Sequence, residues 1–168
     1  PININIFGDI SSAAYFIVAG LIIPNSDIIL RNVGLNPTRI GVLDIVKRMK
    51  GNIEILDKWN ECGEIVGDIR VQYSPDMIGC EIKGEIIPRL IDEIPVIALL
   101  ATQAKGKTEI KDAQDLRNKE SDRISCVVSQ LKKLGANIDE TEDGMIINGK
   151  TTLTGNCQTE SFCDHRLA

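Results

Sequence analysis

The sequence has few of the residues on which metal sites and cross-linked proteins depend. Its 168 residues include a single histidine and five cysteines, and no two cysteines form a Cys-x-x-Cys pair. So few ligands and an odd number of thiols predict neither a zinc site nor a disulfide framework. Reduced thiols favour a cytoplasmic protein. We also find no signal peptide and no apolar run long enough to cross a bilayer, so a membrane is not an expected partner.

Basic residues are fewer than acidic residues. The chain has 19 lysines and arginines against 24 aspartates and glutamates, for a net charge of -5 and a pI near 5.0. This balance argues against nonspecific nucleic-acid binding, although a local cationic site remains compatible with it. A hydrophobic fraction of 43% is ordinary for a soluble globular chain of one domain. The chain begins with Pro1 and stops at Ala168, directly after a charged motif, so we expect a piece of a longer protein.

The most unusual stretch that is present is LRNKESDRI, residues 116–124. Apolar residues then recur at helical spacing: Ile124, Val127 or Val128, Leu131 and Leu134. This pattern places the charged cluster in the first turns of an amphipathic helix, with Lys119 and Arg123 on one face. Two cations and the free N–H groups of a helix start can hold an anion, and Glu120 would lie beside it. A solvated helix face with ordinary ion pairs explains the same residue types.

The chain contains an internal repeat. Arg39 and Arg123 lie 84 positions apart, as do Gly51 and Gly135, and each glycine follows a predicted helix and precedes a predicted strand. Each copy has the outline β-α-β-α-β-β, which predicts an α/β fold. We assign one repeat unit to residues 1–90, a second to 91–163, and the start of a third to 164–168.

Local patterns place the individual elements. Asp9, Ser11 and Ser12 are the candidate caps of the first helix. Helices are predicted at 13–21, 40–49, 95–105 and 123–134, with Gly51 as the stop signal of the second. Strands are predicted at 28–31, 53–56, 68–73, 108–111, from 138 and at 145–147, and residues 78–87 are expected to be extended.

Five stretches resemble the ordered motifs of the EPSP synthase family of enolpyruvyl transferases: GDISSAA at 8–14, NVGLNPTR at 32–39, LIDEIP at 90–95, LRNKESDRI at 116–124 and DHRLA at 164–168. The resemblance implies domains with helices inside and sheets outside, each domain built of three repeat units. It makes this chain part of the C-terminal-type domain, with the first domain absent.

The same resemblance implies roles for individual residues. Asp92 would contact the shikimate hydroxyl and act as a base, and Glu120 would exchange a proton with the methylene carbon of phosphoenolpyruvate. Lys119 would bind shikimate 3-phosphate. Arg123 and Arg166 would bind phosphoenolpyruvate, since a guanidinium can donate two parallel hydrogen bonds to a carboxylate or phosphate.

Other readings stay open for some of these residues. By residue type alone, Asp92 could cap the helix that starts at Pro95. His165 could be protonated near neutral pH, but a lone histidine is more often structural, so we count it as a second-tier site residue. Two positions depart from the family pattern, because Asp115 replaces an asparagine and Asn118 replaces a valine.

The activity implied by the resemblance is transfer of the enolpyruvyl group from phosphoenolpyruvate to the 5-hydroxyl of shikimate 3-phosphate, with release of phosphate, in the shikimate pathway. This reaction requires no metal or organic cofactor. We expect the isolated piece to be inactive, because half of a cleft cannot enclose its substrates. The alternatives are a related transferase acting on a UDP-sugar and a non-catalytic, isolated anion-binding domain.

Overall fold

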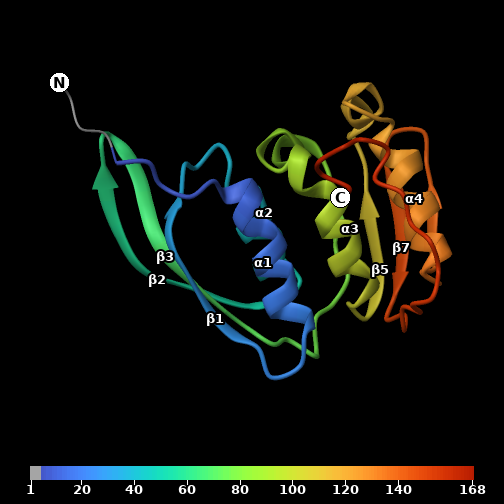
Figure 1. Cartoon of the computed structure of the whole chain (residues 1–168), viewed down its shortest axis with the longest axis horizontal. Helices are drawn as coiled ribbons and strands as arrows, with labels where there is room; N and C mark the ends of the chain where they lie inside the picture. The colour runs from blue at the N-terminus through green and yellow to red at the C-terminus, as the bar shows by residue number, and fades with distance from the viewer. Residues whose placement is uncertain (1–4) are drawn as a thin grey trace.

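A computed structural model of the chain describes residues 5–168 and has two β-sheets with helices between them (Figure 1). Residues 1–4 of the predicted unit 1–90 lie outside the described part. The first half contains α1 (Ile10–Ile22), β1 (Asp27–Gly34), α2 (Gly41–Arg48), β2 (Asn52–Glu61) and β3 (Glu64–Gln72). Its three strands form an antiparallel sheet in the order β1-β3-β2.

The second half has the same succession of elements. They are β4 (Glu81–Ile82), α3 (Ile94–Thr102), β5 (Gly106–Ile110), α4 (Arg123–Lys133), β6 (Ile138–Glu140) and β7 (Met145–Gly149). The strand order is β4-β5-β7-β6, and β4 pairs with β5 in parallel. In the first half, a parallel bridge between Gly8 and Val33 corresponds to that pairing. The second sheet thus begins before the unit boundary predicted at residue 90.

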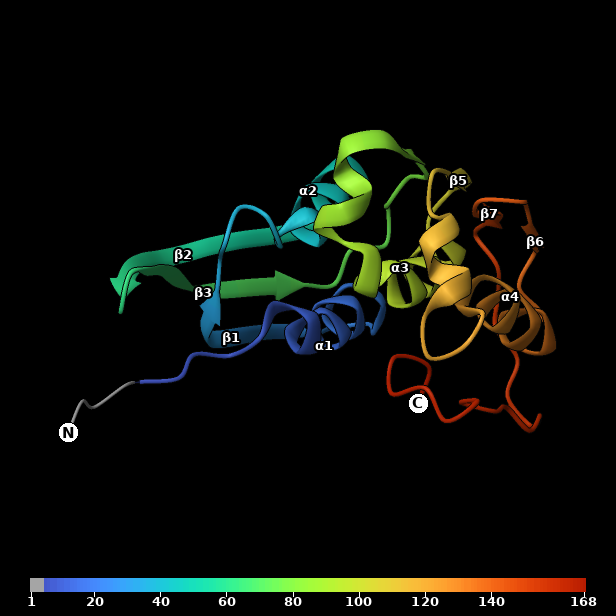
Figure 2. The same cartoon turned by 90° about the horizontal axis from the view of Figure 1, so that it is seen from above.

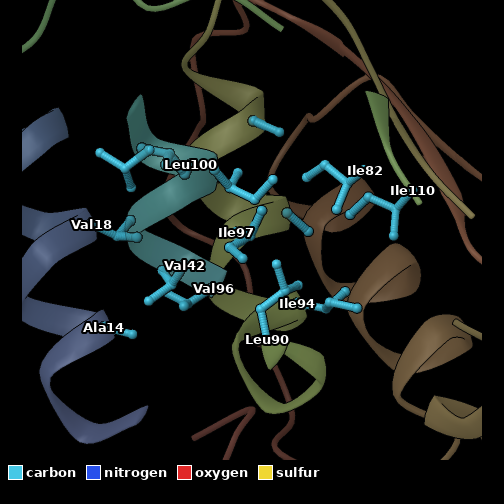
Figure 3. Close-up of a cluster of buried hydrophobic side chains, with 14 of the residues drawn as sticks. Ala14, Val18, Val42, Ile82, Leu90, Ile94, Val96, Ile97, Leu100 and Ile110 are labelled. Carbon is cyan, nitrogen blue, oxygen red and sulfur yellow. The ribbon is translucent and has the colours of Figure 1, made fainter. Parts of the chain in front are cut away.

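The predicted α/β fold with helices inside and sheets outside is confirmed. Helices α1 and α3 pack against each other between the two sheets (Figures 1 and 2). Both are mainly apolar and largely buried, although Phe16 on the outer side of α1 is exposed. Figure 3 shows Ile97 and Leu100 of α3 in the same cluster as Val18 of α1, and all three side chains are buried.

One local prediction was wrong. Residues 78–87 are not extended throughout, because after the short β4 the chain enters a 3-10 helix, Gly84–Arg89. Gly51 follows the end of α2, as predicted, and Lys50 before it lies in the left-handed region with φ 61°. Gly51 also packs closely, because a Cβ there would lie 2.6 Å from Cγ1 of Val46.

Aspartates cap a helix in each half of the chain. Asp9 caps α1 by accepting a hydrogen bond from the Ser12 amide at 2.9 Å, as expected. Asp122 caps α4 in the same way, accepting from the Ser125 amide at 3.1 Å. The carboxylate of each cap therefore fixes where its helix begins. No helix within residues 5–168 is both long and apolar enough to cross a bilayer.

Candidate functional site

The segment that carries Lys119 and Glu120 precedes α4 and does not belong to it. A 3-10 helix, Gln114–Asn118, ends just before Lys119, whose backbone is extended, and α4 begins only at Arg123. The prediction that Lys119 and Arg123 share a helical face was therefore wrong. Both still reach the same carboxylate, because Oδ1 of Asp92 lies 3.4 Å from Nζ of Lys119 and 3.0 Å from Nη1 of Arg123.

Arg123 is the centre of the cluster. Its side chain is only 1% exposed, although it carries a full positive charge. Asp164 binds it through two bonds, from Nε at 2.8 Å and from Nη2 at 3.2 Å, and Glu120 accepts from Nη2 at 2.5 Å. With Asp92 on Nη1, every nitrogen of the guanidinium has a carboxylate partner. Such pairing is what allows a buried charge to be tolerated.

Asp164 is a member of the cluster that the sequence analysis did not select. Its side chain is fully buried, and besides Arg123 it accepts hydrogen bonds from the Ser121 hydroxyl and the Arg166 amide, both at 2.9 Å. Burial opposes ionisation, but these bonds and the Arg123 charge outweigh it and lower the pKa of Asp164 to about 2. The position of Asp164 in the DHRLA motif could have indicated a role in the site, but only its neighbours His165 and Arg166 were predicted as site residues.

Asp92 does not cap α3. It lies in a short 3-10 helix, Ile91–Glu93, and the residue before α3 makes no side-chain cap bond. Burial disfavours the charged form of Asp92, but the nearby charges of Lys119 and Arg166 and the hydrogen bonds from Lys119 and Arg123 hold its pKa below the ordinary value. Asp92 is consequently ionised and weakly basic in this arrangement.

Arg166 and His165, near the C-terminal end of the described chain, are the last two residues predicted for the site. Nη2 of Arg166 lies 4.0 Å from Oδ2 of Asp92, and its buried Nε has no hydrogen-bond partner among residues 5–168. The main-chain carbonyl of Arg166 accepts a hydrogen bond from the Tyr15 hydroxyl of α1 at 3.2 Å. His165 is 64% exposed, and its Nδ1 lies 3.9 Å from the carboxylates of both Glu120 and Asp164. The histidine therefore lies at the edge of the cluster.

Charge in this cluster is balanced. Three cations, Lys119, Arg123 and Arg166, face three carboxylates, and each nitrogen of the Arg123 guanidinium already pairs with one of these carboxylates. Of its acidic partners, Glu120 is the most exposed, at 50%, so it is the carboxylate that an incoming anion can most readily displace. The described part of the site has no surplus positive charge with which to bind a multiply charged anion.

Glu93, next to Asp92, is a second group that sequence reasoning missed. Its side chain is buried, and Oε1 has no hydrogen-bond partner within residues 5–168. Burial raises the pKa of Glu93, and the charge of Asp92 adds to this, while a hydrogen bond from Ser11 acts in the opposite direction. The sequence offered no signal for it, since only the fold turns this side chain inward.

Metal binding has no support in the described residues. No group of three or more His, Cys, Asp or Glu side chains within residues 5–168 is arranged to hold a metal ion. All five cysteines are free thiols. The chemistry available at the cluster is therefore that of guanidinium, ammonium and carboxylate groups.

Comparisons with known proteins agree on one family. The family model described as EPSP synthase (3-phosphoshikimate 1-carboxyvinyltransferase) matches residues 1–168. The 3-phosphoshikimate 1-carboxyvinyltransferase of Bacillus licheniformis is 56% identical over 160 residues, which is 95% of this chain and 37% of the relative. That of Geobacillus thermodenitrificans is 56% identical over 166 residues, 98% of this chain and 38% of the relative.

Solved structures give the same result. The EPSP synthase of Acinetobacter baumannii superposes with a TM-score of 0.94 at 37% identity, covering 98% of this chain and 38% of that one. The enolpyruvyl transferase NikO from Streptomyces tendae superposes with a TM-score of 0.65 over 89% of this chain and 32% of its own. At 16% identity, this second match shows a shared fold alone. The chain spans little more than a third of the length of these relatives.

Proposed function

The chain belongs to the EPSP synthase family, and from that membership we propose that it forms one wall of the substrate site of an enolpyruvyl transferase. The reaction joins the 5-hydroxyl of shikimate 3-phosphate to C2 of phosphoenolpyruvate and releases phosphate. The observation that carries the proposal is the convergence of Asp92, Glu120 and Asp164 on the buried guanidinium of Arg123, with Arg166 beside Asp92. These groups come from separate segments, so only the folded chain brings them together.

The cations of the cluster suit the two anionic substrates. Lys119 is the most exposed of the three cations, and it would bind the phosphate of shikimate 3-phosphate as a point charge. Arg166 keeps its Nε free, and together with Arg123 it would bind phosphoenolpyruvate. For Arg123 to take part, Glu120 must release the Nη2 donor that it occupies here. His165 stays a second-tier residue beside Glu120.

Proton transfer falls to two carboxylates. Asp92 would accept the proton of the attacking hydroxyl, and Glu120 would exchange a proton with C3 of the enolpyruvyl group as it is added and removed. In the ligand-free cluster, Lys119 and Arg166 hold the pKa of Asp92 low. Anions that bind those two cations would offset their charge, so substrate binding raises the basicity of Asp92 at the step that needs it.

The charge balance at the cluster supports a site that is shared with another part of the protein. A substrate phosphate needs more positive charge than these residues leave free. We propose that further cations come from the rest of a longer enzyme, to which this chain contributes part of the C-terminal-type domain. The isolated chain would then bind anions weakly and catalyse nothing, and a cytoplasmic location belongs to the same proposal.

The test is phosphate release by the complete enzyme that contains this chain. We expect release only when phosphoenolpyruvate and shikimate 3-phosphate are both present, and none from the 168-residue chain alone. A UDP-sugar should not replace shikimate 3-phosphate. Release that is unchanged when shikimate 3-phosphate is omitted, or that is faster with the UDP-sugar, would contradict the proposed activity.

Substitutions in the same assay test the residue assignment. Asp92→Asn keeps the shape of the side chain and removes the base, so the turnover should fall by about 10² to 10⁴-fold. Asp9→Asn is the matched control, because Asp9 precedes α1 as Asp92 precedes α3, and asparagine caps a helix as well as aspartate does.

A further inference from the structure

The first arginine of LRNKESDRI has no part in the proposed chemistry, yet it makes an unusually complete set of contacts. Arg117 donates from Nε to the carbonyl of Glu142 at 2.8 Å and from Nη2 to the carbonyl of Thr141 at 2.7 Å. Its Nη1 pairs with Glu140 at 2.8 Å and with Asp122 at 2.9 Å. All of these partners except Asp122 lie in the turn between β6 and β7 or at the end of β6.

The same turn holds the chain before the 3-10 helix that carries Arg117. The carbonyl of Asp143 accepts the Ala113 amide at 2.8 Å, and its carboxylate accepts the Asp112 amide at 2.7 Å. Beyond the segment, Asp122 connects Arg117 to the start of α4, since its carboxylate caps that helix. Residues 119–121 are therefore held on both sides by contacts that lead back to one hairpin turn.

These contacts differ from an ordinary surface ion pair. An exposed pair typically contributes little, because water and salt screen it and both side chains lose freedom. Arg117 is mostly buried, and two of its bonds go to main-chain carbonyls whose position is set by the hairpin. A planar guanidinium can donate in three directions at fixed angles, whereas a lysine in its place cannot.

We propose that Arg117 is a positioning residue, which fixes the segment bearing Lys119 and Glu120 against the β6–β7 turn and so sets where these two groups meet substrate. The inference rests on the proposed function. Lys119 and Glu120 make few contacts of their own: in residues 5–168 their side chains pair only with Asp92, Arg123 and the edge histidine. Their location accordingly depends on how the segment is held at its ends.

The experiment compares Arg117→Gln, Arg117→Lys and Lys132→Gln in the complete enzyme. Lys132 is the matched control, because its ion pair with Asp139 at 2.9 Å also joins α4 to β6 but lies away from the segment. We expect kcat/KM to fall by about 10²-fold in Arg117→Gln, since displacement of about 1 Å at a catalytic group costs that much. Arg117→Lys should recover little of the loss, and Lys132→Gln should stay within about twofold.

Two readouts separate positioning from a general loss of structure. A positioning role raises KM for shikimate 3-phosphate as well as lowering kcat, and it speeds amide hydrogen exchange at residues 119–122 while exchange in α3 is unchanged. A merely structural role lowers kcat at constant KM and speeds exchange throughout the second half. The proposal is overturned by that second pattern, or by a kcat/KM in Arg117→Gln equal to that of Lys132→Gln.

The exchange measurement also separates this proposal from the proposed function. Should the unmodified complete enzyme release no phosphate, the proposed activity fails. Fast exchange at residues 119–122 in Arg117→Gln would then still support the role of Arg117 in holding the segment. Unchanged exchange there would overturn it.

Discussion

Asp164→Asn should destabilise the protein in a way that depends on pH. The substitution keeps the size of the side chain and removes a charge that is fully buried and bound twice by Arg123. The pKa of Asp164 in the folded protein is about 2, against an ordinary value of 3.8. One pKa unit corresponds to about 1.4 kcal/mol, so ionised Asp164 contributes about 2 kcal/mol to the free energy of unfolding at neutral pH.

The direction of the pH dependence follows from the lowered pKa. A carboxylate whose pKa is lower in the folded state stabilises the protein above its unfolded pKa, and the contribution disappears as the pH falls through the folded pKa. The difference between the two proteins should thus be about 2 kcal/mol at pH 7, about 1 kcal/mol near pH 3, and close to zero below pH 2. Arg123 keeps Asp92 and Glu120 as partners, so it is not left unpaired in the variant.

Urea unfolding followed at several pH values between 7 and 3 measures this difference. Asp139→Asn is the control, because Asp139 forms an exposed pair with Lys132 and its loss should change the free energy of unfolding by less than about 0.5 kcal/mol. A difference for Asp164→Asn that is constant over this pH range, or no larger than that of the control, would refute the assignment of Asp164 as a buried, ionised partner of Arg123.

Two further substitutions test other parts of the structure by the same unfolding measurement. Glu93→Gln should become more stable than the unmodified protein as the pH rises, because ionisation of a buried carboxyl with a raised pKa is unfavourable. The free energies of unfolding of the two proteins should converge below the pKa that Glu93 has in the unfolded chain. A difference that widens toward low pH would contradict this. In Gly144→Ala the free energy of unfolding should fall by about 1 to 3 kcal/mol, because the new Cβ would overlap the carbonyl oxygen of Ile110. Gly155 has open space around it, so Gly155→Ala should change the free energy of unfolding by less than about 0.5 kcal/mol. Equal effects would show that the close approach at Gly144 is absent.

The sequence was most informative where a local rule determines the structure. Asp9 is a good N-cap residue, and the structure shows it capping α1. The repeat at 84 positions correctly indicated two halves with the same order of elements. Gly51 marked the end of α2, and the structure adds that it packs closely against Val46.

The site was only partly readable from the sequence. The spacing of Lys119 and Arg123 suggested a shared helical face, yet Asp122 caps α4, the helix begins at Arg123, and Lys119 lies outside it. Asp164, the buried partner of Arg123, was missed although it lies in the DHRLA motif, and Glu93, a buried carboxyl outside that pairing, had no signal in the sequence. Whether an acidic residue faces solvent or a buried guanidinium depends on tertiary packing, which local periodicity does not encode.

We propose that Asp92 is a base beside the Arg123 cluster of an enolpyruvyl transferase. The decisive experiment measures phosphate release by the complete enzyme, with both substrates, in Asp92→Asn and in Asp9→Asn. We expect turnover to fall by about 10² to 10⁴-fold in Asp92→Asn and to stay unchanged in Asp9→Asn. Equal turnover in the two variants would show that Asp92 is not the base.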